Sequence, residues 1–198
     1  TPKIGRKLPD VLSVTEVDAM LAKINLNQPL GHRNRAIMEM LYGCGLRVTE
    51  LVTLRIGDLF FKEGYVRVVG KGDKQRLVPV GDEAVRFVTL YLEQRPTMRV
   101  DPRHAETLFL NNKGRGLTRV MIYHIIREAA RAAGITKHIS PHTLRHSFAT
   151  HLLEGGASIR QVQQMLGHES IVTTEIYTHL DGESLGKNVD LHHPLSDR

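Results

Sequence analysis

The apolar residues near the start of the chain recur at the spacing of an amphipathic helix. They are Val17, Met20, Leu21 and Ile24. A Ser13–Glu16 pair before them has the spacing of a capping box, which predicts that this helix begins after Ser13. A second helix is expected over about 32–42, with an inner face formed by Ile37, Met38, Leu41 and Tyr42. It should end in the Gly43-Cys44-Gly45 break, and a short helix is expected from Thr49 to Leu54.

After Asp58 the hydrophobic pattern changes from helical spacing to alternation, which is typical of strands. The segment FFKEGYVRVVGKGDKQRLVPV predicts a short strand, a Glu63-Gly64 turn and a strand over 65–69. A turn over 70–74 and a strand over 75–80 follow. Together these segments predict a three-stranded antiparallel sheet, the only sheet expected in the chain.

The second half of the chain returns to helical spacing. Helices are expected from about Asp82 to Arg95, and from a Thr118 cap through Ala133. A loop over 96–106 and a short extended piece over 108–110 separate them. Ser140-Pro141 opens a helix closed by Gly155-Gly156, Ser158 caps one ending at Leu166, and Ser170 caps one carrying Tyr177. The fold class predicted is mostly α with a small three-stranded antiparallel β-sheet. Residues 1–12 are interpreted as a linker, 13–181 as the domain and 182–198 as a tail.

The composition of the chain indicates the kind of partner it binds and the compartment in which it is expected. The chain has 198 residues, 41% of them apolar, which is enough for one sizeable core. Its 27 Lys and Arg exceed its 21 Asp and Glu, giving a net charge of +6 that favours a polyanionic partner such as nucleic acid. The single cysteine, Cys44, excludes an intramolecular disulfide and is expected in the core. With no long apolar run and no leader pattern, we expect a cytoplasmic protein without a membrane span.

The segment from Ser140 to Leu180 concentrates the groups that could do chemistry. His142, Arg145, His168 and Tyr177 all lie in it. Guanidinium groups bind phosphates by paired hydrogen bonds, imidazoles move protons, and a tyrosine hydroxyl can attack phosphorus. Arg145 shares a helical face with His142 and flanks a buried stripe of Leu144, Phe148 and Leu152. This position near the start of a helix also favours an anion.

Two further basic residues, Arg47 and Lys71, cannot be assigned a function from their immediate sequence alone. Arg47, in GCGLRVTEL, is by itself an ordinary arginine, and Glu50 could either orient it or be a surface acid. Lys71, in the GKGDKQR turn, would by itself be read as a solvated lysine. Lys74 is the alternative basic group in the same turn. The residues alone leave both questions open.

The motifs GLRVTEL, HTLRH and LGHESIVTTEIYTH resemble those of the tyrosine recombinases of the integrase family, and in particular the Xer-type chromosome-dimer resolvases. The resemblance covers about residues 8–181. It implies the DNA breaking-rejoining fold, with Tyr177 as nucleophile and Arg47 and Arg145 as a phosphate clamp. It further implies that His168 binds a non-bridging oxygen, that Lys71 protonates the leaving 5′ oxygen, and that Glu50 supports the clamp. His142 is the expected proton acceptor.

The same resemblance implies a cofactor-free reaction through a 3′-phosphotyrosyl intermediate, with neither ATP nor metal. The expected partners are a double-stranded DNA recombination site and other recombinase subunits in a tetramer, with a partner recombinase and a DNA translocase left open. It also implies an N-terminal DNA-clamping domain absent from this chain, and a tail that docks on a neighbouring subunit. DNA contacts are expected from Lys74, Arg76, Arg115 and Arg119.

Three other interpretations of the sequence compete with this one. His142 and His146 lie four positions apart, with further histidines nearby, so a metal site has to be considered. There is, however, no HExxH motif and no carboxylate placed to complete such a site. A non-enzymatic DNA-binding module would use the helices Ser158–Leu166 and Ser170–Thr178 as a helix-turn-helix. A type IB topoisomerase would share the chemistry without pairing two sites. The combination of Tyr177 with two arginines favours the recombinase.

Overall fold

The computed structural model describes residues 11–167, and residues 1–10 and 168–198 lie outside that description. The expected linker up to position 10, the helix after Ser170 and the tail therefore lie outside the described residues. Leu12, which we assigned to the linker, is fully buried, and its backbone N–H donates to Ser147 Oγ at 2.9 Å. The packed domain thus includes at least this residue of the segment.

The first three helices begin and end close to where the sequence predicts. Helix α1 spans Val14–Ala22 and starts with the predicted capping box between Ser13 and Glu16. Helix α2 spans Gly31–Cys44, so it continues through Gly43 and Cys44 and ends only at Gly45, where φ is +62°. Helix α3 spans Val48–Val52. We predicted that the helix would end within Gly43-Cys44-Gly45. Gly43 and Cys44 instead belong to the helix and are buried, and Gly45 alone, in the left-handed conformation, ends it.

The predicted three-stranded antiparallel sheet is confirmed. Its strands are β1 (Leu59–Phe60), β2 (Tyr65–Val69) and β3 (Gln75–Pro79), in the order β1-β2-β3. Short 3₁₀ turns lie before β1 (Ile56–Asp58) and between β2 and β3 (Lys71–Asp73). Val66 pairs with Val78 and Val68 with Arg76, so these four residues share one face of the sheet.

The remaining described helices also follow the sequence signals. They are α4 (Asp82–Gln94), α5 (Arg119–Ala132), α6 (Pro141–Glu154) and α7 (Ile159–Leu166). Side-chain caps from Thr118, Ser140 and Ser158 open the last three. Two 3₁₀ turns, Arg95–Thr97 and Pro102–His104, lie in the connection between α4 and α5. The expected extended piece at 108–110 forms an isolated bridge between Leu110 and Gly116.

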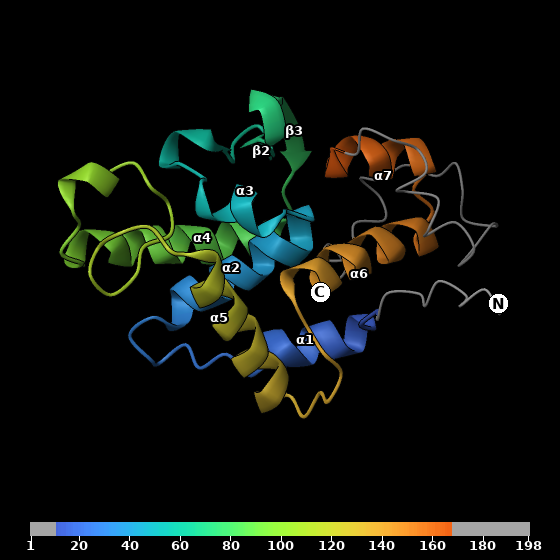
Figure 1. The fold of residues 1–198 in the computed structure, drawn as a ribbon, viewed down its shortest axis with the longest axis horizontal. Helices are drawn as coiled ribbons and strands as arrows, with labels where there is room; N and C mark the ends of the chain where they lie inside the picture. The colour runs from blue at the N-terminus through green and yellow to red at the C-terminus, as the bar shows by residue number, and fades with distance from the viewer. Residues whose placement is uncertain (1–10, 168–198) are drawn as a thin grey trace, which may run out of the picture.

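Helices α2 and α6 form the centre of the molecule. Figure 1 shows α2 between α4 and α6, with the β2–β3 hairpin and α7 above them and α1 below. The predicted stripe of Leu144, Phe148 and Leu152 is fully buried, as is Cys44, whose thiol pKa is raised by burial to about 12. Within residues 11–167, no helix has the length and apolar character needed to cross a membrane.

Gly45 is closely packed between α6 and α7, and this packing yields a first prediction. A Cβ built on Gly45 would lie 2.5 Å from Phe148 Cδ1 and 2.7 Å from Leu166 Cδ2. Gly134 has a similar φ of +71° but no atom within 4 Å of its built Cβ. We expect Gly45→Ala to lower the free energy of unfolding by about 2–4 kcal/mol, through left-handed strain plus overpacking. Gly134→Ala should lose about 1 kcal/mol from strain alone.

Urea unfolding of both variants beside the wild type measures the difference. Equal losses for the two glycines would contradict close packing around Gly45.

Candidate active site

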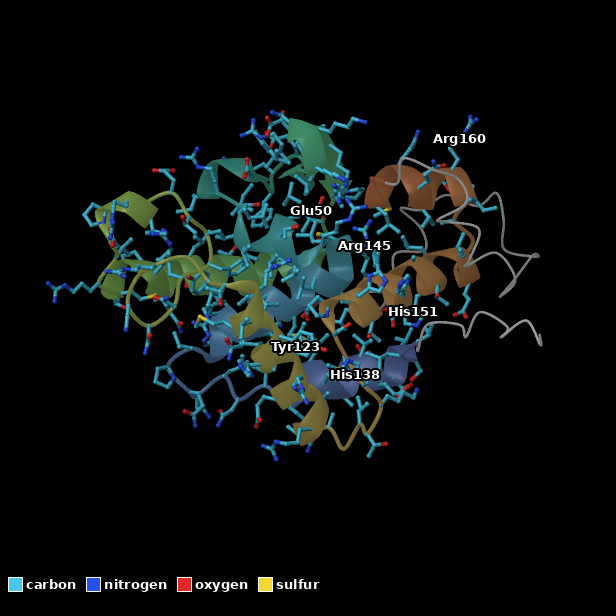
Figure 2. All side chains as sticks on the ribbon, viewed as in Figure 1. Glu50, Tyr123, His138, Arg145, His151 and Arg160 are labelled. Atoms are coloured by element: carbon cyan, nitrogen blue, oxygen red, sulfur yellow. The ribbon has the colours of Figure 1, made fainter. Side chains whose placement is uncertain are left out.

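The carboxylate of Glu50, on α3, is buried and lies among guanidinium groups from the N-cap of the same helix, from β3 and from α6. Its two oxygens accept hydrogen bonds from Arg76 Nη1 at 2.5 Å and Nη2 at 2.9 Å. Arg145 Nη1 lies 3.8 Å from Oε1, and Arg47 Nη1 lies 3.9 Å from Oε2. Figure 2 shows Glu50 and Arg145 close together between α3 and α6. Three cations and one anion therefore meet at one place, and their charges do not cancel.

The local backbone at the start of α3 explains why Arg47 and Glu50 face the same point. Arg47 is the N-cap residue and is extended, with φ −70° and ψ 150°, directly after the turn that ends α2. Glu50 lies one turn later, and its Oε1 accepts the Arg47 backbone N–H at 2.8 Å. The Arg47 side chain stays 42% exposed while that of Glu50 is 2% exposed. Glu50 thus fixes the backbone of Arg47 and leaves its guanidinium open to a ligand.

Arg145, in the second turn of α6, is held by backbone carbonyls. Its Nη1 donates to Gly45 O at 2.7 Å and its Nη2 to Leu166 O at 2.6 Å. These bonds join the ends of α2 and α7 to the start of α6. Burial and the nearby charge of Arg47 lower the pKa of Arg145, yet it stays above neutral, so the guanidinium is charged at pH 7.

The ionisation of Glu50 follows from the same contacts. Burial raises the pKa of a carboxyl group, but here the hydrogen bonds from Arg76 and the Arg47 backbone oppose it. The charges of Arg76 and Arg145 act in the same direction, and the pKa of Glu50 falls below its usual value. Glu50 is therefore ionised at neutral pH, and its carboxylate orients the surrounding guanidinium groups.

Two histidines of α6 form a pair at the edge of the clamp. His142 Nε2 lies 2.5 Å from His146 Nε2, with ring centroids 3.9 Å apart. Only one of two nitrogens at this distance can carry a proton between them. Burial, followed by the charges of Arg145 and Arg47, lowers the pKa of His142, so its imidazole is neutral at pH 7 and can accept a proton. We did not single out His146 as a site residue, although its i+4 spacing from His142 was the available signal.

The turn of the β2–β3 hairpin carries two lysines. Lys71 and Lys74 are both exposed in the turn between the strands. The turn end of the hairpin lies against the clamp, since a Cβ built on Gly70 would lie 3.4 Å from Glu50 Oε2. The turn that carries Lys71 is therefore attached to the wall of the site.

Arg76 does not occupy the place expected of a DNA contact. We predicted that Arg76 contacts DNA, but only 13% of its side chain is exposed, and its guanidinium donates to Glu50 and to Met165 O. Its strand position explains this, because it alternates onto the same buried face as Val78. Arg115 is 56% exposed with its Nε 3.3 Å from Asp101 Oδ2, and Arg119 is exposed at the start of α5. No hydrogen bond or ion pair in the described part of the chain links these last two to the clamp.

Two of the predicted catalytic residues, His168 and Tyr177, lie outside the described residues. His168 directly follows Gly167, which ends α7 beside Arg76. Among residues 11–167, no group of three or more His, Cys, Asp or Glu side chains is arranged to hold a metal ion. The described groups, a cationic clamp beside a neutral imidazole, are suited to binding a phosphodiester and accepting a proton near it.

The chain is similar to known proteins over most of its length. The model of the phage integrase family matches residues 10–184. Tyrosine recombinase XerD of Staphylococcus saprophyticus is 46% identical over 194 residues, covering 98% of this chain and 66% of that protein. Tyrosine recombinase XerD of Listeria monocytogenes is 49% identical over 181 residues, covering 91% of this chain and 61% of that protein. The chain thus spans slightly less than two thirds of the length of these relatives.

Solved structures give the same picture. The XerA recombinase crystal structure superposes with a TM-score of 0.79 at 35% identity, covering 90% of this chain and 63% of that one. XerH site-specific recombinase, in a post-cleavage complex with a palindromic difH substrate, gives a TM-score of 0.79 at 30% identity. That match covers 92% of this chain and 53% of the XerH chain. The predicted fold class is confirmed by this likeness.

The buried charge cluster predicts a specific acid dependence of stability. Glu50→Gln removes the anion and leaves the guanidinium groups of Arg76 and Arg145 without a counter-charge, which should cost about 3–5 kcal/mol at pH 7. Because the pKa of Glu50 is lowered by folding, the carboxylate's contribution is complete above its unfolded value of 4.5 and is lost as pH falls through the folded value. The difference between wild type and Glu50→Gln should therefore shrink below about pH 4.5.

Urea titrations of both proteins at pH 7 and at lower pH measure that difference. Glu63→Gln, an exposed glutamate in the β1–β2 turn, is the control and should change stability little. A difference between wild type and Glu50→Gln that stays constant with pH would show that the charge of Glu50 is not what stabilises the cluster.

Proposed function

The chain belongs to the phage integrase family, and from that membership we propose that it is the catalytic domain of a Xer-type site-specific DNA recombinase. The observation that carries the proposal is the clamp itself, in which Arg47 and Arg145 converge on Glu50 beside a neutral His142. A scissile phosphate bound between these groups would replace water as the partner of Arg47 and of the remaining N–H groups of Arg145. Its negative charge would offset the surplus positive charge of the cluster.

In the proposed reaction the Tyr177 oxygen attacks the scissile phosphorus and its proton passes to His142. The bond from phosphorus to the 5′ oxygen breaks, and Lys71 gives a proton to that oxygen. Arg47 and Arg145 stabilise the extra charge that develops on the non-bridging oxygens, with His168 as a further donor. Removing one such donor from a site of this type costs about 100- to 1,000-fold in rate. The products are a 3′-phosphotyrosyl ester and a free 5′ hydroxyl.

A covalent ester keeps the free energy of the broken phosphodiester bond, so a 5′ hydroxyl from a second strand can reverse the step without ATP. Because this free energy is retained, a covalent intermediate favours strand exchange over hydrolysis. The XerH complex with a difH substrate and the XerD names of the relatives support a double-stranded recombination site as substrate. We therefore assign the protein to resolution of chromosome or plasmid dimers in the cytoplasm, by recombinase subunits assembled as a tetramer on DNA.

A DNA-binding module without catalysis is the competing function. Such a module needs basic residues on its surface, where Arg115, Arg119 and Arg160 lie. It has no need of a guanidinium that is 5% exposed and held by two backbone carbonyls beside a paired histidine. The clamp therefore favours the enzyme.

Covalent capture of DNA tests the proposal. A nicked suicide substrate, which loses the short 5′-hydroxyl strand after cleavage, should trap wild-type protein as a denaturant-resistant adduct at the 3′ phosphate. Tyr177→Phe should form none, because it removes the attacking oxygen. Tyr65→Phe, which removes a hydroxyl from β2 and keeps the ring stacked on Phe60, should form the adduct as the wild type does.

Candidate core sites from the relatives supply the substrates, and the protein is assayed in its full-length context. A lack of adduct for wild type on DNA that it demonstrably binds would favour the non-catalytic module. An adduct that survives Tyr177→Phe would assign the nucleophile elsewhere.

A further inference from the structure

We propose that Arg76 is a positioning residue that ties the Lys71 hairpin to the phosphate clamp, so that Lys71 can deliver its proton when the clamp is loaded. The inference rests on the proposed function and adds a residue to it. Arg76 would touch neither DNA nor the reacting atoms. It would act through Lys71.

The hydrogen bonds of Arg76 fix its guanidinium in one orientation. Nη1 and Nη2 form a two-pronged pair with the Glu50 carboxylate at 2.5 and 2.9 Å, and Nε donates to Met165 O at 2.8 Å. A lysine could not make this set of bonds, because it lacks the planar fork. With 13% of the side chain exposed, water competes weakly for these partners. These bonds hold the guanidinium in a fixed position between Glu50 and Met165.

The partners of Arg76 belong to segments that each carry or adjoin a proposed site residue. Glu50 is on α3 with Arg47, Met165 is at the end of α7 two residues before Gly167, and Arg76 itself is on β3. A Cβ built on Gly167 would lie 3.0 Å from Arg76 Nη1, so Arg76 also packs against the residue that precedes His168. An ion pair that served the core alone would have no reason to join these particular segments.

The path from Arg76 to Lys71 is short and hydrogen-bonded. Arg76 pairs with Val68 across β2 and β3, and the turn beyond is closed by the Gly70 N–H donating to Lys74 O at 2.7 Å. The turn itself contains left-handed residues, Gly72 with φ +72° and Asp73 with φ +59°, and Lys71 is exposed there. Anchoring the hairpin at Arg76 thus sets the place from which Lys71 reaches the 5′ oxygen.

Loss of the hydrogen bonds from Arg76 to Glu50 and Met165 should impair proton delivery more than phosphate binding. Glu50 would still accept the Arg47 backbone N–H and lie beside Arg145, so the clamp keeps its own contacts. The turn that carries Lys71 would no longer be held to Glu50 through Arg76. A small misplacement of a catalytic group costs about 100-fold in rate. We expect Arg76→Met, which keeps the apolar stem, to slow cleavage of an ordinary phosphodiester by about that factor.

A substrate whose leaving group needs no proton separates the two effects. When sulfur replaces the bridging 5′ oxygen, the P–S bond breaks to release a thiolate, and no proton from Lys71 is required. On this DNA, Arg76→Met should recover to within about tenfold of the wild-type rate. Arg76→Lys, which keeps a cation beside Glu50 but cannot form the fork, should show the same selective loss and recovery.

Single-turnover cleavage of both substrates by the full-length protein is the measurement. Arg67→Met is the matched control: Arg67 lies on β2 and donates to Asp58 Oδ1 at 3.0 and 2.8 Å, away from the clamp. It should lose a comparable ion pair and cleave both substrates normally. Circular dichroism melts establish that each variant is folded at the assay temperature.

The outcomes separate this inference from the function on which it rests. Lys71→Ala, which removes the proposed acid, is assayed beside Arg76→Met. If Lys71→Ala recovers on the sulfur substrate and Arg76→Met does not, the positioning role of Arg76 is wrong. It is also wrong if Arg76→Met cleaves both the ordinary and the sulfur substrate at the wild-type rate. If wild type forms no adduct, or Lys71→Ala does not recover, the proposed function or the acid role of Lys71 fails first. Recovery of both variants supports the inference.

Discussion

A carboxylate removed from water must be paired with cations, and this constraint organises the molecule around Glu50. Its side chain is 2% exposed and lies within 4 Å of guanidinium groups from the N-cap of α3, from β3 and from α6. Each arginine except Arg47 also donates to a backbone carbonyl at a helix end. Segments that are far apart in sequence therefore meet because one buried charge requires them to. The site is the place where they meet.

The division between buried and exposed groups gives the cluster its function. Glu50 and Arg76 are largely buried and hold the geometry. Arg145 is also buried and is held by two backbone carbonyls, with further N–H groups left for a ligand. Arg47, His142 and Lys71 are exposed and can meet a ligand directly. The buried set rests on α2 and α6, the two helices at the centre of the core, and Gly45 lets those helices approach. An anionic ligand would complete a charge balance that the protein leaves positive. Preorganisation of this kind is what stabilises developing charge in a reaction.

The sequence predicted the elements well because their signals are local. Caps at Ser13, Thr118, Ser140 and Ser158 and the alternation over 65–79 are confirmed. Side-chain partners were harder, because the bonds from Arg145 to Gly45 and Leu166 cross 100 and 21 positions. Arg76 was assigned to DNA although its alternation with Val78 placed it on the buried face of β3. His146 was considered only as a metal ligand, and the resemblance to the integrase family, rather than spacing, singled out Arg47 and Lys71.

A double-mutant cycle between Glu50 and Arg76 tests the central claim most directly. The free energies of unfolding of Glu50→Gln, Arg76→Met and the double variant are compared with that of the wild type. If the buried carboxylate and the Arg76 fork stabilise the fold through each other, the losses should be strongly non-additive, with a coupling of about 1.5–3 kcal/mol. Losses that add within about 0.5 kcal/mol would contradict the account, because the two residues would then stabilise the domain independently.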